Sequence, residues 1–79
     1  MTPELEFYYN NRFMMMSSQG WLDLVEDVKE MVNTYNNVTT INSVDEFHKR
    51  QGQIDILNWI LNLRDLSEKT YEELNESII

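Results

Sequence analysis

The chain has 79 residues and no cysteine, and its 14 acidic and 6 basic residues give a formal net charge of −8. This length allows one small domain, and the lack of cysteine excludes disulfides and thiolate metal sites. A single histidine argues against a zinc site built from the protein alone. Binding to nucleic acid or to an anionic membrane needs an excess of Lys and Arg. We therefore expect no cofactor, no metal, no direct nucleic-acid contact and no membrane contact.

Residues 1–18 form an N-terminal arm in which aromatic and methionine side chains come in blocks. Neither the helical nor the strand period fits these blocks cleanly, and Asn10 with Asn11 favours a turn between them. Pro3 is also compatible with the first turn of a short helix capped by Thr2. Two uses of the arm stay open. It folds back over the helices that follow, or it docks on a neighbouring subunit, where Met and aromatic side chains suit adaptable interfaces.

The next stretch, residues 19–36, is predicted to form an amphipathic helix with Ser18 as its cap. Acidic and polar residues fill its outer face. Trp21, at the start of the helix, is expected to anchor the core. The apolar face consists of Trp21, Leu24, Val25, Val28, Met31, Val32 and Tyr35.

A loop is predicted for residues 37–42, because Asn and Thr compete with helical backbone hydrogen bonding. Asn36 or Asn37 is expected to end the first helix in the left-handed conformation. Val38 and Ile41 are expected to cover the end of the hairpin. So short a link makes the two flanking helices antiparallel neighbours.

The strongest helical signal begins at Ser43, which forms a capping box with Glu46. Apolar residues then recur at spacings of three, four and seven. The sequence predicts a second helix over about residues 43–75, and this helix either continues straight or bends near Arg64. Ser67 is one of the residues that offer a new cap beyond such a bend.

The polar feature of the second helix is the run His48, Lys49 and Arg50. A single histidine beside two cations matches no catalytic motif, so we expect a surface or interface role for it. Gly52 costs about 1 kcal/mol relative to Ala inside a helix. Such a cost is tolerated where a large group must come close, and Trp21 or a side chain of the arm is the candidate. Ordinary sequence drift explains the glycine equally well.

Together these elements predict an all-α fold, an antiparallel helical hairpin over residues 19–79 preceded by the apolar arm at 1–18. One contact between two helices cannot cover all of the apolar side chains, so we expect them to contact a protein partner. No nucleophile lies beside a base and no phosphate-binding loop is present, so an enzyme is not expected. The candidate partner contacts are Phe7, Tyr8, Tyr9, Phe13, Met14, Met15, Met16, Trp21, Trp59, Ile60 and Leu63.

Two local features stand out in the letters of the sequence, the pair Gly20 and Trp21 before the first helix and the spacing of His48, Gly52 and Leu57 in the second. The first feature lies in the segment GWLDLVEDV (20–28) and the second in FHKRQGQIDILNWILNL (47–63). The acidic segment YEEL (71–74) follows them. With these segments the chain resembles small helical proteins encoded among the structural genes of tailed, podovirus-like bacteriophages. The resemblance implies a virion-associated structural or accessory role and transfers no site residues.

Three functions follow as expectations. The first is a non-enzymatic virion protein, present in many copies, that docks by its apolar helical face and arm on itself or on a larger capsid, portal or tail protein. The second is an acidic inhibitor in the host cytoplasm that presents carboxylates to a basic groove of a host enzyme, and such binding weakens steeply with salt. A partner subunit or chaperone in a cellular complex is a third.

Overall fold

The computed structural model describes residues 1–76, so the last three residues of the predicted hairpin lie outside the description. Within the described part the chain is helical and contains no strand, which confirms the all-α prediction. The helices are α1 (Pro3–Met16), α2 (Gln19–Tyr35), α3 (Val44–Leu61) and α4 (Leu63–Glu76), with a 3-10 turn at Val38–Thr40.

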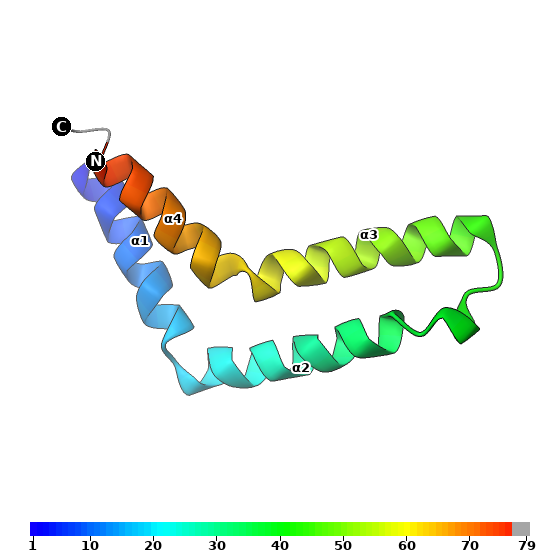
Figure 1. Cartoon of the computed structure of the whole chain (residues 1–79). Coiled ribbons are helices and arrows are strands. Elements are labelled where there is room, and N and C mark those ends of the chain that lie inside the picture. The colour runs from blue at the N-terminus through cyan, green and yellow to red at the C-terminus, as the bar shows by residue number, and fades with distance from the viewer. Residues whose placement is uncertain (77–79) are drawn as a thin grey trace.

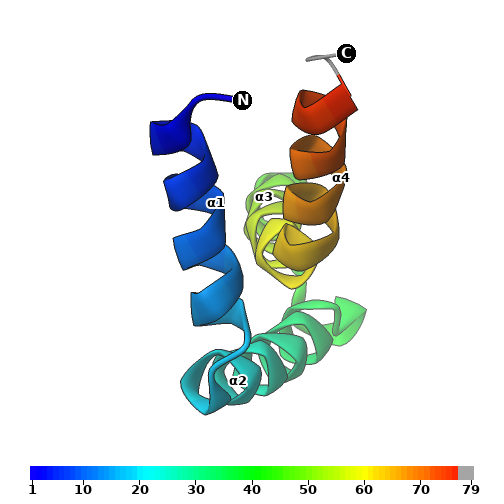
Figure 2. The ribbon, with the colours of Figure 1, turned by 90° about the vertical axis from the view of Figure 1, so that its left-hand side faces the viewer.

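The chain runs outward along α1 and α2 and returns antiparallel along α3 and α4 (Figure 1). In this arrangement α2 packs along α3, and α1 packs along α4. Each leg of the hairpin, α1 with α2 and α3 with α4, bends at the same level, so the molecule is a bent hairpin. Its first and last described residues lie at the same end (Figures 1 and 2). The predicted antiparallel hairpin is therefore confirmed, and the arm extends it.

Three of the helices begin at hydroxyl caps that the sequence predicts. In each case the side-chain oxygen accepts a hydrogen bond from the backbone N–H three residues on, which satisfies a donor that the helix itself leaves open. The caps are Thr2, Ser18 and Ser43, with donor–acceptor distances of 3.1–3.2 Å. At the third cap, the carboxylate of Glu46 accepts from the N–H of Asn42 at 3.3 Å, so the reciprocal bond of the capping box reaches one residue further back than predicted.

The N-terminal arm is a regular helix, and the turn predicted at Asn10 and Asn11 is wrong. Both residues lie inside α1. The reason is tertiary: Tyr9 and Phe13 stack against Tyr71 of α4, with ring centroids 5.8 and 5.6 Å apart. Such packing overrides a weak local preference. In this structure the arm folds back on the chain's own α4.

The connection between α2 and α3 also differs from its prediction. No described residue has a positive φ, so neither Asn36 nor Asn37 adopts the left-handed conformation. Instead α2 ends at Asn36 in a right-handed conformation, and the side chain of Asn37 accepts from the N–H of Thr39 at 3.1 Å to start the 3-10 turn. Val38 is exposed and does not cover the end of the hairpin, whereas Ile41 is half-buried.

The bend in the second leg falls at Asn62, between α3 and α4, two residues before the predicted position. The first leg breaks at the same level, after Ser17. A hydrogen bond of 3.3 Å from the Arg64 guanidinium to Ser17 Oγ joins the two bends across the hairpin. Arg64 also lies 3.9 Å from the carboxylate of Glu68. The two bends are thus coupled by Ser17 and Arg64, although these residues are 47 positions apart in the chain.

The hairpin is a single layer of helices. Its Cα extents are 52 × 28 × 15 Å, and its radius of gyration is 16.7 Å, against about 12 Å for a compact domain of this length. Because each helix has one neighbour along most of its length, few side chains are enclosed. Among the described residues the buried side chains are Tyr9, Met16, Val28 and Ser67.

The predicted apolar face of α2 is divided by this architecture. Leu24 and Met31 are exposed, although the sequence places them with the rest of that face. They lie to one side of the contact line because a single partner helix covers a narrower stripe than seven residues occupy. The members of this face that are buried or half-buried are Trp21, Val25, Val28, Val32 and Tyr35.

Ser67 provides a test of this packing. It lies inside α4 rather than at a cap, and its buried hydroxyl has no hydrogen-bond partner. An unsatisfied buried hydroxyl costs about 1–3 kcal/mol, and Ala is the better helix former. We expect Ser67→Ala to raise the free energy of unfolding by about 1 kcal/mol in urea denaturation followed by circular dichroism.

The matched control is Ser17→Ala. Its hydroxyl donates to the carbonyl of Phe13 at 2.9 Å and accepts from Arg64, so the same substitution there is expected to lower stability. A loss of stability in Ser67→Ala would contradict the packing described for α4.

Candidate functional site

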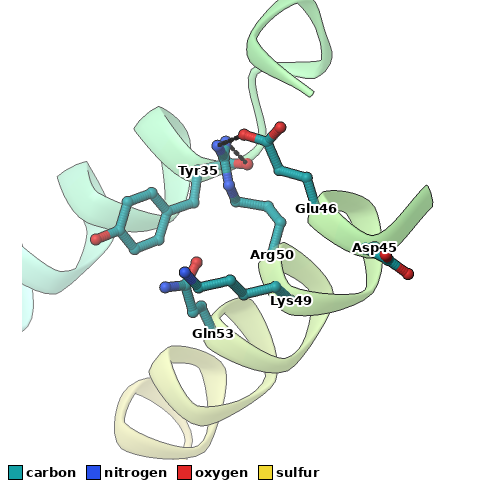
Figure 3. A pocket seen from close by; sticks show the side chains of 6 residues that line it. All are labelled: Tyr35, Asp45, Glu46, Lys49, Arg50 and Gln53. Carbon is teal, nitrogen blue, oxygen red and sulfur yellow. Dashed lines mark hydrogen bonds and ion pairs between the residues drawn. The ribbon is translucent and has the colours of Figure 1, made fainter. Parts of the chain in front are cut away.

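The most organised polar site surrounds Arg50, where α3 passes the end of α2 (Figure 3). The Arg50 guanidinium donates to the backbone carbonyl of Tyr35 and to Thr40 Oγ1, both at 3.0 Å. It also lies 3.7 Å from the Glu46 carboxylate and 5.5 Å from the centroid of the Tyr35 ring. One half-buried side chain therefore ties the end of α2, the connection and the first turns of α3 together.

An open hollow of about 450 Å³ adjoins this cluster and is lined by Tyr35, Asp45, Glu46, Lys49, Arg50 and Gln53. In Figure 3, Lys49 and Gln53 extend from α3 in the same direction, while Asp45 turns away. Two carboxylates balance two cations here, and the Arg50 donors already bind oxygens of the chain. The site has no excess charge to hold an anion and no nucleophile beside a base. We interpret it as a structural clamp.

His48 takes no part in this clamp. It is exposed, and its ring lies edge-on to Phe47 with centroids 5.7 Å apart. Apart from its chain neighbours and the backbone of its own helix, no atom lies within 4 Å of the place where a Cβ on Gly52 would stand. The predicted close approach of Trp21 or of an arm residue to Gly52 is therefore wrong.

The larger feature is apolar surface that the chain leaves uncovered. Helical spacing places seven exposed side chains on one side of the hairpin, a set that we call the broad face. It consists of Tyr8 and Met15 from α1, Leu24 and Met31 from α2, Ile56 and Trp59 from α3, and Leu66 from α4.

Two hollows show that these side chains share a side. Met31 and Ile56, from facing helices, line one hollow of about 510 Å³ together with Gly52. Trp59 and Leu66 line another, of about 260 Å³, with Tyr9, Arg12, Leu63, Ser67 and Thr70. The two hollows lie on the same side of α3, because Ile56 and Trp59, which line one each, are three residues apart on that helix.

The remaining members follow from contacts and spacing. The Arg12 guanidinium carbon lies 4.7 Å from the centroid of the Tyr8 ring, which places Tyr8 beside the second hollow. Met15 follows Tyr8 by seven residues, and Leu24 precedes Met31 by seven, so each pair lies on one line of its helix.

A second exposed surface lies on α1 alone. Phe7 and Met14 are 68% and 72% exposed and are seven residues apart, so they form one line along the helix. Phe7 lies two residues before the buried Tyr9, a rotation of about 200°, and this line therefore points away from α4. We call these two residues the α1 ridge.

The structure divides the partner contacts that the sequence predicts into three groups. Tyr9 and Met16 are buried within the chain. For the residues of the next two groups, contact with a partner stays a prediction. Phe13, Trp21, Ile60 and Leu63 are half-buried. Phe7, Tyr8, Met14, Met15 and Trp59 are exposed.

The sequence pattern indicates Ile56 as part of an apolar face broader than one partner helix covers, but it does not indicate Leu24, Met31 and Leu66 as contacts of a partner. The spacing of Leu24 and Met31 is a signal for a shared line, but it does not reveal that this line falls outside the contact with α3. That outcome depends on how many helices pack against α2.

Comparison of the chain with protein-family models, with curated proteins and with solved structures finds no match. Across residues 1–76, no group of three or more His, Cys, Asp or Glu side chains could hold a metal ion. No helix in that range is long and apolar enough to cross a membrane. The broad face and the α1 ridge are therefore the features from which a function can be inferred.

The clamp at Arg50 can be tested by substitution. Arg50→Ala removes two hydrogen bonds from a charged donor, each worth about 1.5–3 kcal/mol, and leaves the Tyr35 carbonyl without this donor. We expect the free energy of unfolding to fall by about 2 kcal/mol or more in urea denaturation.

Lys69→Ala is the control, because it changes the net charge equally at an exposed position of α4. An equal loss of stability in both variants would show that net charge, and not the clamp, accounts for the effect.

Proposed function

We propose that this chain is a non-enzymatic structural or accessory protein of a tailed-phage virion, present in many copies, that docks on a larger capsid, portal or tail protein. The observation that carries the proposal is the extent of apolar surface left exposed by a single layer of helices. Contiguous exposed apolar side chains mark interaction sites. The resemblance of residues 20–28, 47–63 and 71–74 to small proteins of phage structural gene regions supports the virion as the setting.

The α1 ridge is the attachment surface in this proposal. Phe7 and Met14 are among the most exposed large apolar side chains described, and Phe and Met are enriched where proteins meet. Helix α1 extends to the open end of the hairpin (Figure 2). Because helical spacing places the ridge on the side of α1 away from α4, a large partner can reach it without displacing another helix. Glu4 and Glu6 in the first turn of α1 favour a partner with basic groups around an apolar pocket.

A second candidate function rests on the outer face of α2. Four carboxylates at helical spacing are exposed there, on the side away from α3, namely Asp23, Glu26, Asp27 and Glu30. One of them, Glu26, is paired with Lys29 at 3.2 Å. Such an acidic stripe suits a basic groove, as a host-directed inhibitor requires, and its binding would weaken steeply with salt.

The virion proposal is tested by complementing a phage that lacks the gene and measuring the chain in purified particles by quantitative mass spectrometry. We expect tens of copies or more per particle. In the double variant Phe7→Glu, Met14→Glu the number is expected to fall by about tenfold or more, because two apolar anchors are lost.

Val44→Glu is the control, since Val44 is equally exposed but lies at the start of α3, away from the ridge. Absence of the unsubstituted chain from particles would contradict the proposal. Salt-sensitive capture of a host enzyme by the same chain would then favour the inhibitor.

A further inference from the structure

We infer that the broad face is a self-association surface, on which a second copy of this chain forms the second layer of a helical dimer. The inference goes beyond the proposed function, which uses the α1 ridge. The broad face and the ridge lie on different sides of α1, because Tyr8 and Met15 are each rotated by about 100° from Phe7 and Met14. One copy can therefore bind its twin and the larger partner at the same time.

The exposed area of the chain fits this inference. The accessible surface is 6033 Å², about 1,000 Å² more than the roughly 5,000 Å² of a compact monomer of 9.5 kDa. Each partner in a standard protein interface buries about 800 Å². One interface of ordinary size, formed once per copy, thus brings this chain to the exposure of a compact protein.

The layer architecture points to the same occupant. Stable domains consist of at least two packed layers, and this chain is one layer, 15 Å thick across its Cα atoms. The broad face extends on both sides of the bend in the hairpin. Met31 and Ile56 lie on α2 and α3 on one side of the bend, and Tyr8 and Leu66 lie on α1 and α4 on the other. A second bent hairpin has the same length and the same bend, so it can cover the whole face.

The charges on the face favour an acidic occupant. Neither of its two hollows is lined by a carboxylate, and each contains a cation, Lys49 in one and Arg12 in the other. This is unusual in a chain with 14 acidic and 6 basic residues. The occupant should therefore combine an apolar face with acidic groups around it.

The chain itself has this composition. Asp27 lies three residues after Leu24 and four before Met31, and Glu73 lies seven after Leu66, so helical spacing places both carboxylates directly beside apolar residues of the broad face. In a two-fold dimer each contact occurs twice. These carboxylates of one copy can then approach the cations of the other, while the apolar side chains meet.

The inference is tested by sedimentation velocity on the full chain, with Ile56→Glu compared with Val44→Glu. Both positions are on α3 and are similarly exposed, at 65% and 71%, but only Ile56 belongs to the broad face. We expect the unsubstituted chain and Val44→Glu to sediment with twice the mass of 9.5 kDa. Ile56→Glu is expected to raise the dimer dissociation constant by about tenfold or more.

A second variant, Leu66→Glu, places the same charge on α4, on the other side of the bend, and is expected to act like Ile56→Glu. Circular dichroism of each variant, at a concentration at which that variant is dimeric, checks that its helix content is unchanged. Equal weakening in Val44→Glu would overturn the inference, because the effect would not be specific to the face.

Sedimentation of the unsubstituted chain as a monomer at all concentrations would also overturn it. If that monomer were still incorporated into particles, the proposed function would stand and a different protein would cover the broad face. Loss of incorporation in Phe7→Glu, Met14→Glu with dimerisation intact would support both assignments, because the α1 ridge and the broad face would then act as separate surfaces.

Discussion

The structure depends on one constraint: a helical hairpin has a single line of contact, and this chain has more apolar side chains than that line can enclose. Val28 is buried because it lies at the centre of the contact of α2 with α3. Met31, three residues on, is exposed because no third helix covers its side. The same geometry that makes the fold simple therefore leaves the surface that we assign to partners.

Polar contacts keep this thin layer in one shape. Arg50 fixes the closed end of the hairpin by binding the last turn of α2 and the connection at once, and Arg64 joins the two bends through Ser17. These two arginines thus connect helices that only a few buried side chains hold together. Because both legs bend together, the broad face keeps one curvature along its length, and a face of fixed shape is what a matching second copy needs.

The predictable part of the fold is the part governed by short-range chemistry. The caps at Ser18 and Ser43 and the amphipathic period of α2 follow from local hydrogen bonding and spacing, and the structure confirms them. The helix through Asn10 and Asn11 could not be predicted, because stacking on Tyr71, far along the chain, stabilises it. The exposure of Leu24 likewise depends on how many helices pack against α2. The hydrophobic periodicity of the sequence does not indicate that number.

The most direct test of the central claim, that a second copy completes this single layer, is the thermal unfolding midpoint measured by circular dichroism over about a hundredfold range of protein concentration. If folding and dimerisation are coupled, the midpoint should rise by about 5–10 °C across that range, because association favours the folded state by mass action. A midpoint that does not change with concentration would show that one copy is stable alone and would contradict the account.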